Sequence, residues 1–322
     1  MESTAIVAVT PSSEVSETIR EDLDRAADYA RAEKSPATRK AYMSDFQIFG
    51  LWCKDRGVMA LPASPESVAA YLAFEAVRGA KPSTIGRRCA AIRYIHSIKP
   101  YPTPTDDERV KAVVRGIRRT VGVAPRRMIP ATSQHIIAMA PRLDGSLTAF
   151  RDRALLLLGF AGAFRRSELV ALDVADIEQV QEGLRVTIRH GKTDQERAGA
   201  IIAIVRGELA CPVAALHAWL KAAEITDGPV FRSIRRGGHV RADRLTDRSV
   251  ANIVKAHAER VGLDPALFSG HSLRAGFLTS AAKRGASLFK MMATSRHRSI
   301  DTLAGYVRDQ ELFADHAGAG LL

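Results

Sequence analysis

The sequence predicts a mainly α-helical protein of two domains, with a small antiparallel β-sheet in the second. Its 322 residues suit two domains, because a single hydrophobic core rarely grows much beyond about 250–300 residues. Helical stretches separated by proline-marked breaks fill the first 120 residues, and helical patterns prevail again after residue 130. The exception lies at residues 184–189 and 200–205, where two β-branched runs flank a polar segment and predict a hairpin.

The helices of the first domain are marked by prolines placed where a helix can begin. Ser35 and Pro36 open a helix that runs through Cys53, since proline costs little in the first turn. After a proline break, a second helix is predicted at residues 66–77. Further helices follow: Lys81-Pro82 opens the third, and a basic helix at residues 110–119 closes the domain.

The third helix has two distinct faces. Its apolar face is expected to be buried and contains Ile85, Cys89, Ile92 and His96. The opposite face carries Arg87 and Tyr94, flanked by Thr84 and Arg88. This face is either an ordinary solvated surface or a surface laid against DNA, and the basic segments on both sides favour DNA.

Four segments are expected along the chain. An N-terminal extension with a helix occupies residues 1–34, and the helical domain occupies residues 35–120. A linker is predicted at residues 121–130, because VGVAPRRMIP is largely apolar, contains prolines and lacks a helical period. The second domain, residues 131–322, ends in a short apolar tail.

Positive charge is concentrated in one short segment. The formal net charge is +12, and residues 81–127 alone hold 12 basic and 3 acidic side chains. Residues 1–80, in contrast, hold 9 basic and 12 acidic side chains. A localised basic block is typical of a protein that binds nucleic acid.

Cysteine usage and hydropathy indicate the compartment. The three cysteines are far apart and form no disulfide or metal-ligand pattern, which favours a reducing environment. The longest apolar stretch, residues 154–164, is far short of the ~20 residues that span a bilayer. The N-terminus lacks a signal-peptide pattern. We therefore expect a cytoplasmic protein with no membrane partner.

Two cationic residues stand at unusual positions. Arg165 lies at the end of an apolar helix, where a buried charge requires a partner or a ligand, and Glu168 is the candidate partner. A helix-end salt bridge is the alternative. Lys192 lies at the tip of the predicted hairpin in a GKT triplet. This is no nucleotide-binding loop, because Val186 stands where that motif needs glycine.

The last third of the chain supplies further polar candidates. His271 and Arg274 are neighbours at i, i+3 if they share a helix, so both can reach one ligand, although a surface pair is the alternative. His297 and Tyr306 follow nine residues apart, which is two and a half helical turns. The chain between them must therefore bend if both serve one site.

These residues occur in an order that resembles the tyrosine recombinase (phage integrase) family. The blocks RRSEL, GKTDQ, HSLRAG and HRSIDTLAGYVR are similar to that family's active-site blocks, in order and with ordinary spacing. The segments starting at Ser35 and Lys81 resemble the core-binding domain of Cre-like and Xer-like two-domain members. The resemblance covers residues 35–310. Two departures occur, because Arg296 stands where the family often has glycine and Ala275 where it often has histidine.

The resemblance implies a site-specific DNA recombinase that works without metal, ATP or any other cofactor. Tyr306 would attack the phosphate to give a 3′-phosphotyrosyl link, while Arg165 and Arg274 hold its non-bridging oxygens. Its other active-site residues would act through hydrogen bonds and proton transfer: His297 at the transition state, Lys192 as general acid, His271 at the nucleophile and Glu168 as an orienting group.

The resemblance also implies how DNA is held. A C-shaped clamp would enclose the duplex between the helical core-binding domain and the catalytic domain. The expected DNA contacts, mostly with phosphate, are Thr38, Lys40, Thr84, Arg87, Arg88, Arg118 and Arg119. Arg87 is the candidate for reading a base edge. Exchange of C-terminal tails would join four copies on two double-stranded DNA sites, in the nucleoid.

Two other functions are compatible with the sequence. A type IB topoisomerase uses the same chemistry but rejoins the same strand, and the core-binding segment and apolar tail favour strand exchange instead. A catalytically silent DNA-binding protein would not need the complete set of catalytic residue types. Covalent adducts distinguish these functions: adducts clustered at paired sites indicate recombination, and scattered adducts indicate a topoisomerase.

Overall fold

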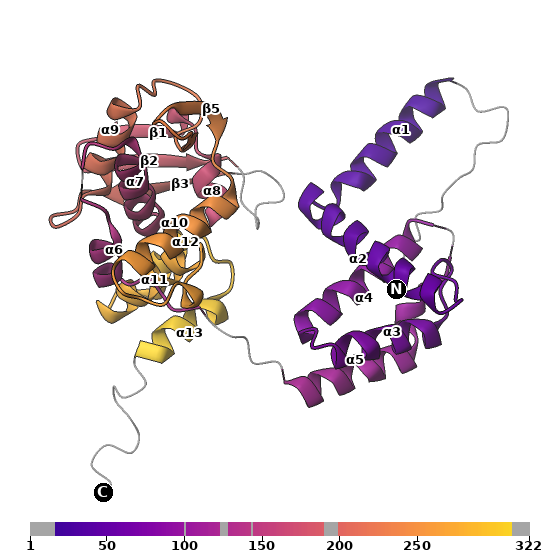
Figure 1. The fold of residues 1–322 in the computed structure, drawn as a ribbon. Coiled ribbons are helices and arrows are strands. Elements are labelled where there is room, and N and C mark those ends of the chain that lie inside the picture. Colours follow the sequence, from indigo (N-terminus) through magenta and orange to yellow (C-terminus); the bar gives the residue numbers. More distant parts are fainter. Residues whose placement is uncertain (1–16, 100, 123–127, 143, 190–198, 311–322) are drawn as a thin grey trace, which may run out of the picture. The chain divides into compact units, whose positions relative to one another are not determined.

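The computed structural model describes residues 17–99, 101–122, 128–142, 144–189 and 199–310 (Figure 1). The chain divides into two compact units, Met1–Arg126 and Arg127–Leu322. Within the described ranges, no helix combines the length and the apolar character needed to cross a bilayer.

The first unit is entirely helical in its described part. Its elements are α1 (Glu17–Ala32), α2 (Pro36–Asp55), α3 (Pro65–Val77), α4 (Pro82–Ser97), the 3-10 turn η1 (Pro104–Asp106) and α5 (Glu108–Val121). The helices predicted from the proline-marked starts are confirmed. The hydroxyl of Ser35 accepts the Thr38 N–H at the start of α2, at 3.2 Å, which satisfies one of the free donors of the first turn.

Aromatic rings fill the core of the first unit. The ring of Tyr71 in α3 lies 5.0 Å from that of Phe49 and 5.5 Å from that of Trp52, both in α2. His96 at the end of α4 is fully buried, and its Nε2 accepts the Ala63 N–H at 3.0 Å. The predicted inner face of α4 is thus confirmed at its buried positions, and it ties α4 to the loop before α3.

The second unit wraps helices around two small antiparallel sheets. Its helices are α6 (Ser133–Met139), α7 (Leu147–Ala161), α8 (Arg166–Ala171), α9 (Pro212–Ala222), α10 (Asp247–Arg260), α11 (Ser272–Lys283), α12 (Leu288–Ser295) and α13 (Ile300–Gln310), with 3-10 turns η2 (Val174–Asp176) and η3 (Pro265–Leu267). Its strands are β1 (Ile177–Val180), β2 (Gly183–Ile188), β3 (Ala200–Val205), β4 (Arg232–Ile234) and β5 (Val240–Arg244).

The first sheet has the order β1-β2-β3, and the second pairs β4 with β5. The two predicted strands are confirmed as β2 and β3, paired from Gly183↔Val205 to Ile188↔Ala200. Inward residues such as Val186 and Ile202 pack into a core that is continuous with α7 and α9. The predicted polar turn between them, residues 190–197, lies outside the described residues.

A close backbone contact fixes α11, the helix that carries Arg274. The Ala131 N–H donates to the Ser272 carbonyl at 2.9 Å. A Cβ on Gly276 would lie 1.7 Å from the Ala131 carbonyl oxygen, so only glycine permits this approach. The chain around Ala131 is therefore part of the second unit's framework. Of the predicted linker, residues 121–130, the stretch 123–127 lies outside the described part.

Candidate active site

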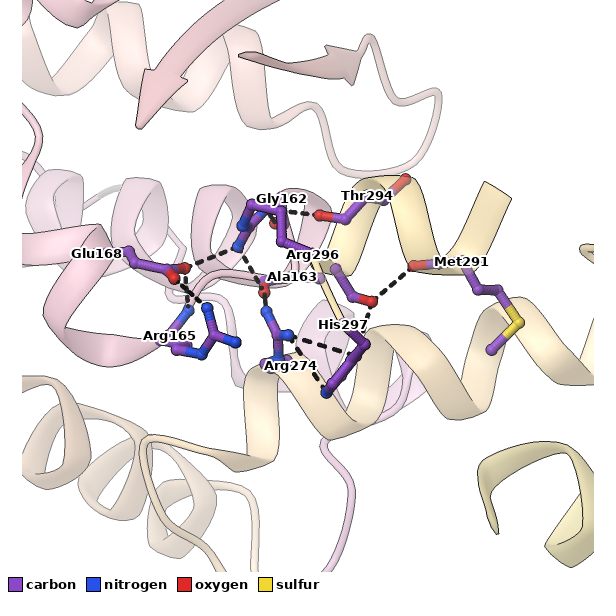
Figure 2. Close-up of polar contacts among 10 residues, drawn as sticks. Gly162, Ala163, Arg165, Glu168, Arg274, Met291, Thr294, Arg296 and His297 are labelled. Carbon is purple, nitrogen blue, oxygen red and sulfur yellow. Dashed lines mark hydrogen bonds and ion pairs between the residues drawn. The ribbon is translucent and has the colours of Figure 1, made fainter. Parts of the chain in front are cut away.

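The site is built on the tight turn between α7 and α8. Ala163 has a left-handed backbone, with φ 45°, and Phe164 next to it is buried. A Cβ on Gly162 would lie 2.3 Å from the Phe164 ring, so the turn requires glycine there. The turn directs two carbonyl oxygens, those of Gly162 and Ala163, towards arginine side chains (Figure 2). Arg165 follows as the residue that precedes α8.

Glu168 is the single acidic group of this cluster in the described chain. It is 2% exposed, and its carboxylate accepts the Arg165 backbone N–H at 2.9 Å and the Arg165 Nη1 at 2.5 Å (Figure 2). Burial alone would raise the pKa of Glu168, but Arg296 and Arg165 outweigh burial and lower it. The carboxylate therefore stays ionised and keeps Arg165 in place, as the i, i+3 spacing predicts.

Arg274 is a fully buried cation. It is 1% exposed and donates from Nη1 to the Ala163 carbonyl at 2.7 Å, while its Nη2 lies 3.3 Å from His297. Burial, together with the charges of Arg165 and Arg296, lowers the pKa of Arg274 to about 9, which leaves it protonated at neutral pH. A buried, charged guanidinium beside a second one creates a strong site for an anion.

His297 is oriented by a hydroxyl. The Ser295 hydroxyl donates to the Met291 carbonyl at 2.6 Å and lies 2.8 Å from Nδ1 of His297. Because the single hydroxyl proton is used, Ser295 accepts from Nδ1–H, which assigns the tautomer. Burial and the positive charge of Arg274 lower the pKa of His297 to about 4. The imidazole is therefore neutral in the free protein, with Nε2 as an acceptor.

The depressed pKa of His297 predicts acid sensitivity of the fold. The neutral form is favoured in the folded state, so the stability that it contributes is complete above about pH 6.5 and is lost as pH falls towards 4. We expect this loss to be about 1–2 kcal/mol. Urea unfolding of His297→Asn between pH 7 and pH 4 should show a shallower fall than the unsubstituted protein. His239→Asn, at an exposed site, is the control and should keep the full slope.

The remaining predicted residues lie at different distances from this centre. His271 is the residue that precedes α11, and partial desolvation and the charges of Arg274 and Arg165 lower its pKa. Tyr306 is half-buried on α13 and packs against the small core around Leu278. Its electrostatic interaction with Arg274 raises the pKa of Arg274. The bend expected between His297 and Tyr306 is present, since α12 ends before His297 and α13 follows. Lys192 lies outside the described residues.

Arg296 is a member of this cluster that the sequence did not identify as functional. Its guanidinium donates to the Glu168 carboxylate at 2.7 Å and to the carbonyls of Gly162 and Ala163 at 3.1 and 3.2 Å (Figure 2). The sequence marked it only as an arginine where related chains often have glycine. That departure was the available signal, because a large cation at a glycine position must find space and partners.

The predicted DNA-contact residues occupy three helices of the first unit. The ring of Tyr42 in α2 lies 5.5 Å from the ring of Tyr94 in α4, and Arg87 of α4 donates to Asp45 of α2, so α2 and α4 run antiparallel. Thr38 and Lys40 therefore lie towards the end of the pair that holds the start of α2, Thr84 lies towards the opposite end, and Arg87 lies beside the middle of α2. The Arg118 guanidinium of α5 lies beside Gly86 of α4, and Arg119 is exposed at the end of α5.

Two of these arginines are held by acidic partners. Arg87 forms a two-point bond with the buried carboxylate of Asp45, at 2.6 and 3.1 Å, yet its side chain stays 53% exposed. Arg88 is 14% exposed and pairs with Glu75 of α3. Arg88 therefore points into the helical bundle in this structure, whereas Arg87 is fixed with a face open to a ligand.

Comparison with known proteins assigns the family. The model of the phage integrase family matches residues 127–312. The chain is 40% identical over 295 residues to the "Integrase/recombinase xerD homolog" of Selenomonas ruminantium, over 89% of this chain and 86% of the relative. It is also 25% identical over 294 residues to "Recombinase cre" of Escherichia phage P1, over 85% of this chain and 84% of the relative. The chain belongs to the phage integrase family.

A solved structure agrees at the level of the fold. The XerH site-specific recombinase bound to a palindromic difH substrate, in a post-cleavage complex, superposes with a TM-score of 0.59 and 15% identity, covering 80% of this chain and 72% of that one. With the sequence relatives, the family makes this chain a tyrosine-type site-specific DNA recombinase. Neither a topoisomerase nor a silent DNA-binding protein is favoured.

Proposed function

We propose that Tyr306 is the nucleophile of this recombinase and forms a 3′-phosphotyrosyl link, leaving a free 5′-hydroxyl on the cut strand. The observation that carries the proposal is the convergence of Arg274, Arg165 and His297 beside the helix of Tyr306. Nearby positive charge stabilises a phenolate and so favours attack by the tyrosine oxygen. The link conserves the energy of the phosphodiester, so a strand can be rejoined to a new partner without ATP.

Arg165 and Arg274 are proposed to hold the two non-bridging oxygens of the scissile phosphate. A phosphodiester resists attack because its anionic oxygens repel the nucleophile, and two fixed guanidiniums offset that charge as the transition state forms. Glu168 keeps the Arg165 side chain in position through their 2.5 Å bond. The guanidiniums provide the positive charge that a metal ion supplies in other phosphoryl-transfer enzymes.

Proton transfers are assigned to three further side chains. Lys192 is proposed as the general acid that protonates the departing 5′-oxygen, and His271 as the group that accepts the proton of Tyr306. The lowered pKa of His271 supports its role, because a neutral imidazole can accept a proton. His297 adds a hydrogen bond to the transition state. Rejoining reverses each transfer with the 5′-hydroxyl of another strand.

DNA is proposed to lie in a clamp formed by the core-binding domain, residues 35–120, and the catalytic domain, residues 131–322, joined by the linker 121–130. Phosphate contacts are assigned to exposed residues such as Lys40 and Arg119. Four copies would assemble on two sites by exchange of the C-terminal tail. Such an enzyme would work in the cytoplasm, associated with the nucleoid.

Covalent adducts test the nucleophile directly. The protein is mixed with sheared DNA from its native locus in EDTA, denatured, and digested with nuclease and trypsin. Mass spectrometry should find a nucleotide on peptide 299–308, whose only tyrosine is Tyr306. Sequencing of the attached DNA should give 3′-linked ends clustered at one or two paired sites. A nucleotide on another tyrosine peptide, or adducts that appear only with a divalent metal, would refute the proposal.

A further inference from the structure

Arg296 has a left-handed backbone conformation, which is unfavourable for a residue other than glycine. It follows α12 with φ 57° and ψ 38°, in the left-handed region where glycine commonly ends a helix. Its backbone N–H donates to the Met292 carbonyl at 2.7 Å, which is the bond of a helix end. A glycine would fit this turn without strain. The contacts of the side chain must therefore explain why an arginine stands at this position.

The arginine side chain also carries a second cost. It is 12% exposed, and its Nε–H is buried without a hydrogen-bond partner among the described residues. Strain and unsatisfied donors persist only where the surroundings hold them, and they cluster at active sites. Two of the three non-glycine residues with a left-handed backbone in the described chain, Ala163 and Arg296, are joined by a hydrogen bond here.

The four N–H groups at the tip of Arg296 all point at the framework of the site. Nη1 donates to the carbonyls of Thr294 and Gly162, and Nη2 to the carbonyl of Ala163 and the carboxylate of Glu168 (Figure 2). The four N–H groups at the tip thus have four protein acceptors, which leaves none for a phosphate. Arg296 therefore acts on a substrate only through its neighbours.

Those neighbours are the partners of the two phosphate arginines. The Ala163 carbonyl that Arg296 contacts also accepts from Arg274, and the Glu168 carboxylate that it contacts also accepts from Arg165. The guanidinium of Arg296 therefore contacts one hydrogen-bond partner of Arg274 and one of Arg165. The positive charge of Arg296 also repels the charge of Arg274, and a bound phosphate anion would offset this repulsion.

We propose that Arg296 is a positioning residue for DNA cleavage, which holds Glu168 and the Gly162–Ala163 turn so that Arg165 and Arg274 both face the scissile phosphate. This inference rests on the proposed function of those arginines. It explains why this chain has arginine where the family often has glycine. The strained backbone is the consequence of that role.

Single-turnover cleavage at saturating protein tests this role. The substrate is the duplex site recovered from the adducts, with either a normal phosphate or a methylphosphonate at the scissile position. The methylphosphonate removes the negative charge that the arginines meet. We expect Arg296→Gly to slow cleavage of the normal site about 10- to 100-fold, as for the loss of a supporting group. Its defect on the methylphosphonate should be much smaller.

Three controls make the result specific. Arg165→Ala should show the same shift in the ratio of the two rates, because Arg296 acts through Arg165. Arg298→Gly, the same substitution at an exposed site, should keep the ratio of the unsubstituted protein. Arg296→Lys should recover part of the rate, since an ammonium can still pair with Glu168, and it provides the test if the glycine variant does not fold.

The outcomes separate this inference from the function on which it rests. An unchanged rate for Arg296→Gly, or equal slowing of both substrates together with a lower melting temperature, would show that Arg296 is merely structural. Absence of DNA on peptide 299–308 of the unsubstituted protein would instead refute the assignment of Tyr306. A ratio that shifts in Arg296→Gly and returns towards normal in Arg296→Lys would establish the positioning role.

Discussion

Tyr306→Phe should bind DNA as the unsubstituted protein does and form no covalent adduct with it. The substitution removes one oxygen atom, and that oxygen is the proposed nucleophile, so cleavage has no alternative route at this centre. The ring still packs against the small core around Leu278, so the fold is retained. Adduct capture in EDTA should fall below detection, which is a loss of at least about 10⁴-fold.

A second tyrosine provides the matched control. Tyr29→Phe makes the same change on α1, where the residue is 80% exposed and belongs to the other unit. It should form adducts at the rate of the unsubstituted protein. Adducts in Tyr306→Phe at the same sites, or their loss in Tyr29→Phe, would contradict the assignment of the nucleophile. Binding measured by gel shift distinguishes loss of chemistry from loss of DNA.

Arg274→Met should lower cleavage strongly without lowering stability. We expect a decrease of about 10²- to 10³-fold, the usual effect of removing a charged donor from a transition state. No carboxylate in the described chain lies within ion-pair distance of Arg274, whose contacts are the Ala163 carbonyl and His297. A buried cation of this kind costs free energy, so methionine should raise the free energy of unfolding by about 1 kcal/mol.

In Arg274→Met, the free energy of unfolding should rise while the cleavage rate falls. Urea unfolding at pH 7 gives the stability, and single-turnover cleavage of the mapped site gives the rate. The Ala163 carbonyl keeps its bond from Arg296 in this variant, which limits the loss of hydrogen bonding. Arg284→Met, exposed at the end of the same helix, should change stability by less than about 0.5 kcal/mol. A destabilised Arg274→Met with normal cleavage would contradict the phosphate role.

Local patterns predicted the elements whose signals are contained in a few neighbouring residues. The Ser35-Pro36 start of α2 and the alternation in β2 and β3 are of this kind, as is the pairing of Arg165 with Glu168, which lies one helical turn away. The strands β1, β4 and β5 were missed because they are three to five residues long and rich in polar side chains.

Contacts between distant residues could not be predicted in this way. Arg88 turns inward to Glu75 and Arg87 is fixed by Asp45, partners that lie 13 and 42 residues earlier in the chain. Arg296 reaches Glu168 across 128 residues. A helical pattern shows which face a side chain starts from, but a long arginine can follow the surface to a partner that only the tertiary fold supplies.

The orientation of His297 by the Ser295 hydroxyl has a consequence for the timing of the reaction. At rest, Nε2 offers a lone pair, whereas a hydrogen bond to a phosphoryl oxygen requires a proton there. The incoming phosphate offsets the surrounding guanidinium charge and so raises the proton affinity of the ring. Under the proposed role of His297, the substrate thus brings about the protonation state that its own cleavage needs. In the unloaded enzyme the ring carries no proton on Nε2, so the proposed hydrogen bond from His297 to the phosphate forms only once DNA is bound.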